Sequence, residues 1–555
     1  MIYTSPFPPV TVEQQHKGGV FDFTLTESNP NFNPSKTALI DALTGKKVSY
    51  GELASESLRF ADGLTQVAKL ERRQTVLLFS PNSILFPVLL FAGQAAGLVV
   101  STANSSYLPD ELAHAIALSD AALIFASADT LDVTVKACKD AGFSHSNVYV
   151  LPGSDGQLPS SLPSGMKTYD VLRGSDAFKP VIPSVDEAKR DVAYLPYSSG
   201  TTGAAKGVAL SASNITSCVL QTRQTKGVFD QEDTVLSVLP MSHIESPFGL
   251  VVMLHLTFYN GGTCVCLPKF DLPKALESVQ KYKCTTALLV PPIALALAKH
   301  PIVDNYDLTT LRYILCGAAP LSAELEAAVH KRLKGRTLVF QGLGMTETTS
   351  VAMIPPNAES KPGTVGKLLS TIEARLVSPE GKDVPKGESG ELWLRGPNIM
   401  LRYTKNEKST RETLTDDGWL MTGDICTRTE DGYYAVIDRA KELIKYSGFQ
   451  VAPAEVEGCL LECPLVADAA VIGVWSDERA TELPRAYIVP NPEHAKSPTL
   501  KEDVAAFVAD KLAPHKRLRG GVFVLEAIPK SPSGKILRKD LRVLAAKETE
   551  GKAKL

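Results

Sequence analysis

The sequence predicts an α/β protein whose large N-terminal domain is built on helix-covered, mostly parallel sheets. Short apolar runs alternate with stretches of helical length through the first two-thirds of the chain, as at residues 75–79, 122–125 and 234–238. This alternation is typical of strand–helix–strand units, in which helices cover a parallel sheet. A chain of 555 residues is also too long for one hydrophobic core, so at least two domains are expected.

The character of the sequence changes near residue 360, where glycine and proline become frequent and short alternating strands begin. Residues 391–395 and 433–437 follow such patterns and predict a small, barrel-like β unit over about residues 360–437. The last section mixes strand and helix patterns, which indicates a small α+β domain over residues 442–555. The predicted organisation is an N-terminal domain at residues 1–437, a hinge at residues 438–441 and a mobile C-terminal domain.

The bulk composition argues against several classes of protein. Its 58 basic and 61 acidic side chains leave a formal charge of −3, so no positive field favours nucleic acid as a partner. The nine cysteines include no Cys-x-x-Cys pair, which favours reduced thiols of an intracellular protein over a zinc site or a disulfide framework. The N-terminus lacks a secretory signal, and the longest apolar stretches, residues 86–100 and 249–259, should not span a membrane.

The strongest local signal is at residues 197–207, which read Tyr-Ser-Ser-Gly-Thr-Thr-Gly-Ala-Ala-Lys-Gly directly after an apolar strand. Backbone N–H groups and hydroxyls in such a loop can surround phosphate oxygens, and Lys206 can neutralise their charge. The motif is not a P-loop, because the chain contains no Gly-x-x-x-x-Gly-Lys followed by Ser or Thr. We therefore expect a nucleotide-phosphate site of another kind.

Four further motifs follow in order. They read Gln-Gly-Leu-Gly-Met-Thr-Glu at residues 341–347, Gly-Trp-Leu-Met-Thr-Gly-Asp at 418–424, Asp-Arg-Ala-Lys-Glu-Leu-Ile-Lys-Tyr-Ser-Gly-Phe-Gln at 438–450 and Pro-Lys-Ser-Pro-Ser-Gly-Lys-Ile-Leu-Arg at 529–538. Together with the phosphate loop they resemble the signatures of the adenylate-forming superfamily of acyl-CoA synthetases, luciferases and peptide-synthetase adenylation domains. The resemblance spans nearly the whole chain and is strongest to 4-coumarate–CoA ligase-like enzymes. It implies a ligase that uses ATP, Mg²⁺ and coenzyme A to form an acyl-adenylate and then an acyl-CoA thioester.

The resemblance assigns roles to residues at the reacting phosphate. Lys535 corresponds to the lysine that bridges the carboxylate and the α-phosphate, and the reaction requires such a charge because an anion attacks a polyanion. Thr346 is expected to hydrogen-bond the α-phosphate. Glu347 and Thr202 are expected to hold Mg²⁺, which favours oxygen ligands and water. Lys535, Thr346 and Glu347, together with His243, form the predicted catalytic set.

Other residues are expected to bind ATP or coenzyme A. Asp424 lies in a Thr-Gly-Asp turn, where its carboxylate could accept both ribose hydroxyls, and Arg439 resembles a ribose-contacting arginine of the family. Leu343 stands where the family often has an aromatic side chain against adenine, and leucine can still cover the base by dispersion. The remaining predicted contacts are Ser198, Ser199, Gly200, Thr201, Thr202, Gly203, Lys206, Gly342, Lys445, Ser447, Gly448 and Gln450.

The predicted hinge has a chemical reason. Lys535 must be close while the adenylate forms, whereas a different surface must face the adenylate when the long thiol of coenzyme A arrives. A hinge with two settings resolves that conflict. Lys445, Ser447, Gly448 and Gln450 resemble family positions that serve one or the other setting.

The acyl pocket departs from the pattern of the coumarate ligases. His243, in a Leu-Pro-x-x-His block, could orient the substrate carboxylate or shape the thiol tunnel, or be a satisfied buried histidine. Glu245 stands where those ligases commonly have tyrosine, and it either lines the pocket, where it needs a partner, or lies on the rim. Ser350 replaces a common proline, and Gly317 and Ala318 complete the predicted pocket. The expected substrate is an aryl-propenoic or a medium- to long-chain monocarboxylic acid.

The tripeptide Ala553-Lys554-Leu555 resembles the Ser-Lys-Leu peroxisomal address. Lys552 places another basic residue before it. We therefore expect recognition by the peroxisomal import receptor, with a cytoplasmic location as the alternative.

Three other functions share these motifs. A standalone adenylation enzyme would load a carrier protein, and a luciferase-like enzyme would oxidise its adenylate. A non-catalytic acyl-nucleotide-binding relative is disfavoured by Lys535, Glu347 and Asp424, because charged side chains are costly to keep in a site without a function. Ligation of an acid to coenzyme A is the leading hypothesis.

Overall fold

A computed structural model of the chain describes residues 1–10, 19–198, 205–225, 229–242, 249–317, 321–356, 359–440, 442–446, 449–476, 479, 481–531 and 534–553. These residues belong to two compact units. The larger unit comprises Ile2–Ala374 and Leu394–Leu420, and the smaller unit comprises Met1, Arg375–Trp393 and Met421–Leu555. The hinge at residues 438–441 stays a prediction, and its Lys441 lies outside the described residues.

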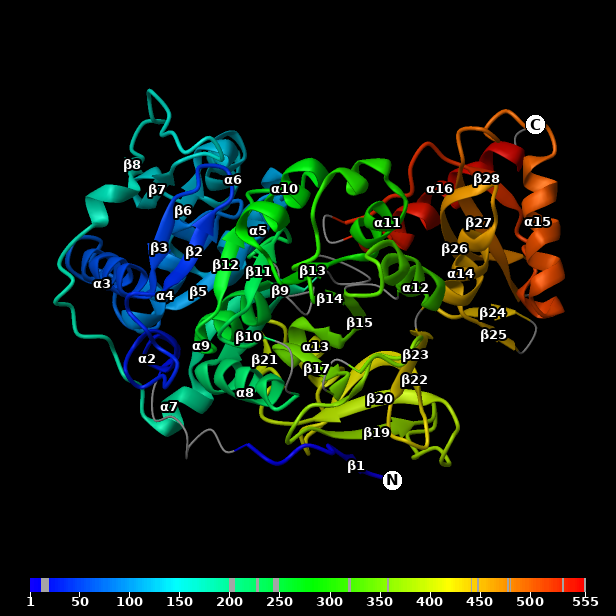
Figure 1. Cartoon of the computed structure of the whole chain (residues 1–555), viewed down its shortest axis with the longest axis horizontal. Helices are drawn as coiled ribbons and strands as arrows, with labels where there is room; N and C mark the ends of the chain where they lie inside the picture. The colour runs from blue at the N-terminus through cyan, green and yellow to red at the C-terminus, as the bar shows by residue number, and fades with distance from the viewer. Residues whose placement is uncertain are drawn as a thin grey trace. The chain divides into compact units, whose positions relative to one another are not determined.

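One sheet of the larger unit has eight strands in the order β21-β10-β9-β5-β4-β6-β7-β8 (Figure 1). Its strands from β9 to β8 are parallel neighbours, whereas β10 and β21 continue the sheet in antiparallel fashion. The bounds are β4 Thr75–Phe79, β5 Val99–Ala103, β6 Ala121–Ser127, β7 Val148–Leu151, β8 Lys167–Thr168, β9 Val192–Ser198, β10 Lys206–Ser211 and β21 Arg402–Tyr403. Every residue of β4, β5 and β7 is buried, as expected of strands that helices cover on both faces.

The second sheet of the larger unit has seven strands in the order β15-β14-β13-β11-β12-β2-β3. All neighbours are parallel except β2 and β3. The bounds are β2 Thr37–Asp41, β3 Lys47–Ser49, β11 Thr234–Ser237, β12 Thr263–Cys266, β13 Thr286–Leu289, β14 Tyr313–Cys316 and β15 Leu338–Gln341. The two sheets confirm the predicted α/β class with mostly parallel sheets.

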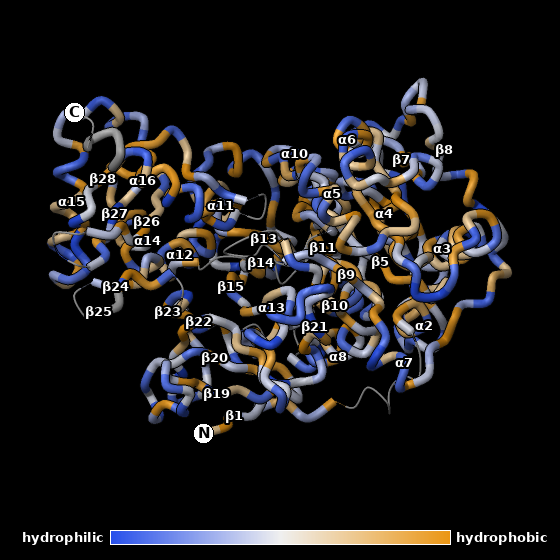
Figure 2. The backbone as a smooth tube through the Cα atoms, turned by 180° about the vertical axis from the view of Figure 1, so that it is seen from behind, coloured by the Kyte–Doolittle hydropathy of each residue, from blue (hydrophilic) through white to orange (hydrophobic). Residues whose placement is uncertain are grey.

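The helices of the larger unit begin and end at signals in the sequence. A capping box starts α3, because Ser49 and Glu52 each accept a hydrogen bond from the other's backbone N–H. Helix α4 is buried from Phe86 to Ala95, and its mostly apolar sequence is coloured by hydropathy in Figure 2. The bounds are α2 Val20–Leu25, α3 Tyr50–Gln66, α4 Leu85–Ala95, α5 Pro109–Ser119, α6 Leu131–Ala141, α7 Val185–Arg190, α8 Ala212–Arg223, α9 Thr257–Tyr259, α10 Leu272–Tyr282, α11 Pro291–Lys299, α12 Ala323–Arg332 and α13 Glu407–Arg411.

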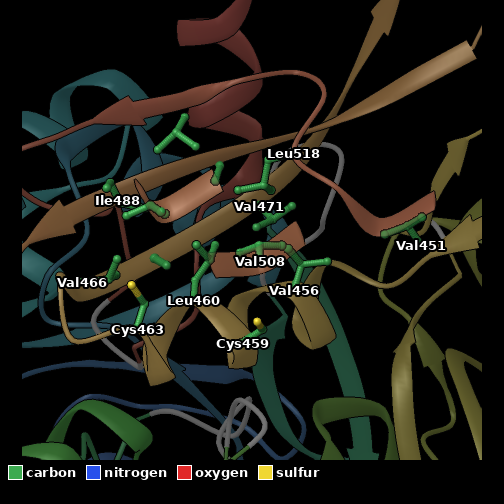
Figure 3. Close-up of a cluster of buried hydrophobic side chains, with 14 of the residues drawn as sticks. Val451, Val456, Cys459, Leu460, Cys463, Val466, Val471, Ile488, Val508 and Leu518 are labelled. Carbon is green, nitrogen blue, oxygen red and sulfur yellow. The ribbon is translucent and has the colours of Figure 1, made fainter. Parts of the chain in front are cut away.

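The smaller unit has a core of its own. Strand β26 (Val466–Ser476) pairs antiparallel with β27 (Thr481–Pro490), which pairs parallel with β28 (Val522–Val524). Helices α14 (Pro453–Glu462) and α15 (Leu500–Lys511) bury Val456, Leu460 and Val508 in one hydrophobic cluster with Val471 and Ile488 of the sheet (Figure 3). Together with α16 (Arg538–Ala553), these elements confirm the predicted α+β character of the C-terminal section.

Several short strands complete the described part of the chain. Strands β16, β17 and β18 form an antiparallel sheet in the larger unit, and β22 pairs antiparallel with β23. The remaining bounds are β1 Tyr3–Thr4, β16 Leu343–Met345, β17 Ser350–Ile354, β18 Lys367–Leu368, β19 Glu373–Val377, β20 Gly390–Arg395, β22 Leu420–Arg428, β23 Tyr434–Arg439, β24 Ile444–Tyr446 and β25 Phe449–Val451. Within the described residues, no helix is both long and apolar enough to cross a membrane.

Asn82 fixes the segment that leads toward the predicted acyl pocket. Its buried amide donates to the carbonyl oxygens of Leu239 (2.9 Å) and Leu267 (3.0 Å) and accepts from the N–H of Met241 (2.7 Å). The hydroxyl of Thr102 also donates to the Ser242 carbonyl at 2.9 Å. The chain is therefore held by side-chain hydrogen bonds directly before residue 243.

We expect Asn82→Ala to lower the free energy of unfolding of the larger unit by about 3 kcal/mol, because it leaves buried backbone groups without partners. Urea unfolding followed by tryptophan fluorescence measures the change. Asn147→Ala, at an exposed position of the same unit, is the matched control and should change the free energy by less than about 0.5 kcal/mol. Equal urea concentrations at the midpoint of unfolding for the two variants would contradict this account of Asn82.

Candidate active site

The two ends of the predicted phosphate loop lie opposite each other. Ser198 ends β9 and Lys206 begins β10, and the two residues are paired across these antiparallel strands. The Lys206 ammonium lies over the ring of Tyr403, 4.6 Å from its centroid, in a cation–π contact. The sheet thus fixes the Lys206 cation at the base of the loop. Five predicted loop residues lie outside the described residues: Ser199, Gly200, Thr201, Thr202 and Gly203.

A tight, strained turn carries the predicted α-phosphate and magnesium residues. Strands β16 and β17 pair closely enough that a Cβ atom on Gly344 would lie 1.7 Å from the Ser350 carbonyl oxygen, so only glycine fits there. Thr349 and Ser350 have φ values of 60° and 131°, which non-glycine residues rarely adopt. Thr346 and Glu347 lie within this turn. Strain of this kind is found at functional sites and requires support from the surrounding structure.

Asn398 provides that support. The side-chain amide of Asn398 donates to the Thr348 carbonyl at 3.0 Å. The backbone carbonyl of Asn398 accepts the Thr349 hydroxyl at 2.6 Å. Inside the turn, the Thr348 hydroxyl accepts the Met345 N–H at 2.9 Å. These bonds hold the backbone in its unfavourable conformation, so the side chains at 346 and 347 have fixed positions.

The Glu347 carboxylate is buried and oriented. Tyr403 donates its hydroxyl to Oε1 of Glu347 at 2.6 Å, and the Glu347 carbonyl accepts the Met400 N–H at 2.8 Å. Tyr403 therefore contacts both Lys206 and Glu347, and it brings the cation of the phosphate loop and the predicted magnesium ligand to one place. The neighbouring Thr346 hydroxyl is buried and has no hydrogen-bond partner among the described residues. An unpaired buried hydroxyl is a donor available to a ligand.

The second motif and the acyl pocket are described only in part. The Gln341 side chain, at the end of β15, donates to the Leu321 carbonyl at 2.8 Å and accepts the Leu321 N–H at 2.7 Å. Gly342 and Leu343 follow, and a Cβ atom on Gly342 would lie 3.0 Å from the Met353 carbonyl oxygen. Gly317, after β14, donates its N–H to the Leu289 carbonyl. The predicted pocket residues His243, Glu245 and Ala318 lie outside the described residues, and Ser350 is buried in the strained turn.

The predicted ribose residues form an ion pair in the smaller unit. Asp424 on β22 and Arg439 on β23 are directly paired, and Arg439 Nε lies 3.1 Å from Asp424 Oδ1. Burial raises the pKa of the Asp424 carboxyl, and the positive charges of Arg439 and Lys535 oppose that rise. Asp424 therefore lies within the electrostatic influence of Arg439 and Lys535, two of the predicted cations of this unit.

Lys535 lies on a short turn between the two residues of a β-bridge, and helix α16 follows. Lys530 and Ile536 form the bridge, and the Ser531 N–H donates to the Lys535 carbonyl at 2.8 Å. Gly534 has a φ of 82°, which the turn requires and glycine adopts without cost. The backbone of Lys535 therefore takes part in closing the turn. Pro532 and Ser533 lie outside the described residues.

The residues predicted to serve the two hinge settings follow Arg439. Lys445 on β24 is paired with Gln450 on β25, and the Lys445 N–H donates to Glu482 at 2.7 Å. The backbone therefore brings these two predicted positions opposite each other. Ser447 and Gly448, between them, lie outside the described residues.

Two sets of contacts were not found by sequence reasoning. Tyr403 lies in no motif, and only its pairing beside β10 places it against Lys206 and Glu347. Arg538 ends the last motif, where the sequence indicates no role for it, yet its guanidinium is largely buried between Glu442 and Glu457. The helical position of Arg538 gives no signal of this, because its partners lie 81 and 96 residues away in sequence.

The chain resembles known proteins along nearly its full length. The profile of the AMP-binding enzyme family matches residues 26–404, and that of the AMP-binding enzyme C-terminal domain matches residues 455–535. A probable 4-coumarate–CoA ligase of Dictyostelium discoideum is 37% identical over 520 residues, which cover 92% of each chain. A peroxisomal OPC-8:0-CoA ligase of Arabidopsis thaliana is 36% identical over 93% of this chain and 92% of its own. The solved structure of ATP-bound MatB from Rhodopseudomonas palustris has a TM-score of 0.82 and 27% identity, covering 95% of this chain and 99% of that one.

We expect Tyr403→Phe to weaken ATP binding about tenfold in the presence of Mg²⁺, since the variant keeps the ring under Lys206 but loses the hydrogen bond that orients Glu347. Isothermal titration calorimetry measures the dissociation constant. Tyr282→Phe, which removes a hydroxyl bonded to Ala42 at 3.2 Å, is the control and should change it by less than about twofold. An unchanged constant in Tyr403→Phe would mean that the hydroxyl does not support the nucleotide site.

Proposed function

Because this chain belongs to the AMP-binding enzyme family, we propose that it joins an aryl-propenoic or a medium- to long-chain monocarboxylic acid to coenzyme A. The chemistry is that of the acid–CoA ligases that the chain resembles over more than nine-tenths of its length. ATP activates the acid as an acyl-adenylate, and the thiol of coenzyme A then displaces AMP. The observation that carries the assignment of the site is the buried hydroxyl of Thr346, which has no hydrogen-bond partner in the described part of the chain and lies beside the oriented carboxylate of Glu347.

In the first step, one oxygen of the substrate carboxylate attacks the α-phosphorus of ATP and pyrophosphate leaves. Thr346 donates its hydroxyl to an α-phosphate oxygen, and Lys535 supplies positive charge to the carboxylate and the phosphate as they approach. Asp424 accepts the ribose hydroxyls, and Arg439 holds the Asp424 carboxylate in place. Lys206 and the loop before it neutralise charge on the phosphates.

Mg²⁺ fits the donors at the strained turn. Glu347 offers a buried carboxylate whose Oε1 is already fixed by Tyr403, and oxygen ligands of this kind suit a hard cation. A bound Mg²⁺ would neutralise charge on the triphosphate of ATP. Thr202 is the second proposed ligand from the protein, and a single carboxylate is sufficient because phosphates and water complete the coordination of this ion.

In the second step, the sulfur of coenzyme A attacks the acyl carbon, AMP leaves and the thiol proton passes to solvent. We assign the change between the two steps to the hinge at residues 438–441. Lys445, Ser447, Gly448 and Gln450 serve the settings of that hinge. The pairing of Lys445 with Gln450 across β24 and β25 supports their assignment to one surface.

The names of the relatives support the proposed substrates. One relative is named as a probable 4-coumarate–CoA ligase, which supports aryl-propenoic acids, and another as an OPC-8:0-CoA ligase, which supports medium-chain acids. His243 is proposed to orient the substrate carboxylate. Pyrophosphate release with cinnamic, phenylacetic, medium-chain and dicarboxylic acids tests the assignment, and turnover of dicarboxylic acids alone would overturn it.

Glu245 offers a second test of the pocket. If its carboxylate faces the acyl group, Glu245→Gln should raise kcat/KM for a dicarboxylic acid relative to a matched monoacid, because like-charge repulsion is removed. An unchanged ratio would place Glu245 on the rim of the pocket.

A peroxisomal location completes the proposal. A relative named as peroxisomal is 36% identical to this chain, and residues 553–555 fit the Ser-Lys-Leu type of address.

The luciferase-like and carrier-loading alternatives are tested by light emission and by offering a carrier protein in place of coenzyme A.

We expect Lys535→Ala to slow adenylate formation at least about a hundredfold, the scale of one preorganised contact to developing charge. Thioester formation from supplied acyl-adenylate should stay within about threefold of the wild-type rate, because Lys535 serves only the first step. Pyrophosphate release and acyl-CoA formation are measured separately. An equal loss in both half-reactions would contradict the proposal that Lys535 serves adenylate formation and not thioester formation.

A further inference from the structure

Arg538 lies three residues after Lys535, at the start of α16, and its side chain is almost completely buried. Its guanidinium uses each of its nitrogen atoms. Nε donates to the Val471 carbonyl at 3.2 Å, and Nη1 donates to Glu442 Oε2 at 2.7 Å. Nη2 lies 2.7 Å from both carboxylate oxygens of Glu457. Such a fork geometry fixes direction as well as distance.

The two carboxylates come from different parts of the smaller unit. Glu457 lies on α14 and also accepts the Val471 N–H at 2.8 Å, so it is anchored to β26. Glu442 comes directly after the proposed hinge, and its N–H donates to the Arg439 carbonyl at 2.9 Å. Arg538 therefore connects the turn that carries Lys535 with the segment that carries the ribose-binding Arg439.

Three carboxylates, those of Glu457, Glu442 and Asp438, act on the guanidinium of Arg538. Asp438 is a third buried carboxylate near this guanidinium, and it accepts the N–H groups of Arg439 (2.7 Å) and Ala454 (3.1 Å). Burial raises the pKa of both Asp438 and Glu457, and the charge of Arg538 opposes the rise. The Arg538 cation thus interacts with three acidic groups, those of Glu457, Glu442 and Asp438, and a buried arrangement of this kind is sensitive to the loss of either partner.

Ion pairs restrain the Lys535 turn on both of its sides. Before the turn, Lys530 pairs with Asp468 of β26 at 2.6 Å, and after it Arg538 pairs with Glu442 and Glu457. The Lys530–Asp468 ion pair joins the turn to the sheet, whereas the Arg538–Glu442 ion pair joins it to the segment that follows the proposed hinge. The Arg538–Glu442 pair therefore joins the Lys535 turn to the segment that carries Arg439.

We propose that Arg538 is a positioning residue, which through Glu442 couples the Lys535 turn to the hinge segment and so holds Lys535 in place for adenylate formation. This inference rests on the proposed function of Lys535. Arg538 and Glu442 act through Lys535 and are assigned no contact with ATP, the acid or coenzyme A.

Glu442→Gln tests the proposal with little change in volume. We expect adenylate formation to fall about tenfold, as the charge-assisted bond to Arg538 is replaced by a neutral one, and thioester formation from supplied acyl-adenylate to change less than about twofold. Arg538→Lys should show the same split with a larger loss, because an ammonium cannot bind two carboxylates as a fork. Glu548→Gln is the matched control, since it removes a carboxylate of the same helix α16 that pairs with Arg485 at 3.1 Å. It should leave both half-reactions within about twofold.

A double-mutant cycle separates positioning from a structural role. If Glu442 acts through Lys535, Glu442→Gln in the Lys535→Ala background should cause no further loss of adenylate formation. Multiplicative losses, equal losses in both half-reactions or an unchanged first half-reaction in Glu442→Gln would overturn the inference. Thermal unfolding shows whether each variant folds, and Glu442→Gln carries the test if Arg538→Lys does not fold. A wild-type enzyme that forms neither adenylate nor thioester would overturn the proposed function instead.

Discussion

The reaction depends on overcoming the repulsion between two anions, a carboxylate and the triphosphate of ATP. Fixed positive charge and oriented donors lower that barrier only where the protein holds them in place before the substrates arrive. In the larger unit, Lys206 lies against Tyr403, which orients Glu347, and Asn398 holds the strained backbone that carries Thr346. These contacts fix the positions of residues that we propose to bind the phosphate groups.

The smaller unit meets the same requirement in a different way. Its predicted catalytic cation, Lys535, lies on the turn between the bridged residues Lys530 and Ile536. Ion pairs on both flanks restrict that turn, and one of them reaches the segment next to the Asp424–Arg439 pair, which we propose to bind ribose. The cost of burying Asp438, Glu442 and Glu457 is offset by Arg538, so the electrostatics of the proposed hinge and of the Lys535 turn are linked.

The sequence predicted the fold class because the period of its apolar residues is a local property, and β4 and β11 lie where their apolar runs indicate. The motif residues were recognisable because several types must occur together at fixed spacing. The supporting residues were not recognisable for the opposite reason. Tyr403 meets Glu347 across 56 residues and Asn398 meets Thr348 across 50, so only the folded chain brings each pair together. Nothing local distinguishes Tyr403 from an ordinary tyrosine at the end of a strand.

The fate of one oxygen atom tests the central claim most directly. The wild-type enzyme would be given an acid labelled with oxygen-18 in its carboxylate, together with ATP, Mg²⁺ and coenzyme A, and the products analysed by mass spectrometry. Attack of the carboxylate on the α-phosphorus predicts one labelled oxygen in AMP and none in pyrophosphate. Label in inorganic phosphate, with ADP as the nucleotide product, would show attack on the γ-phosphorus and contradict the account.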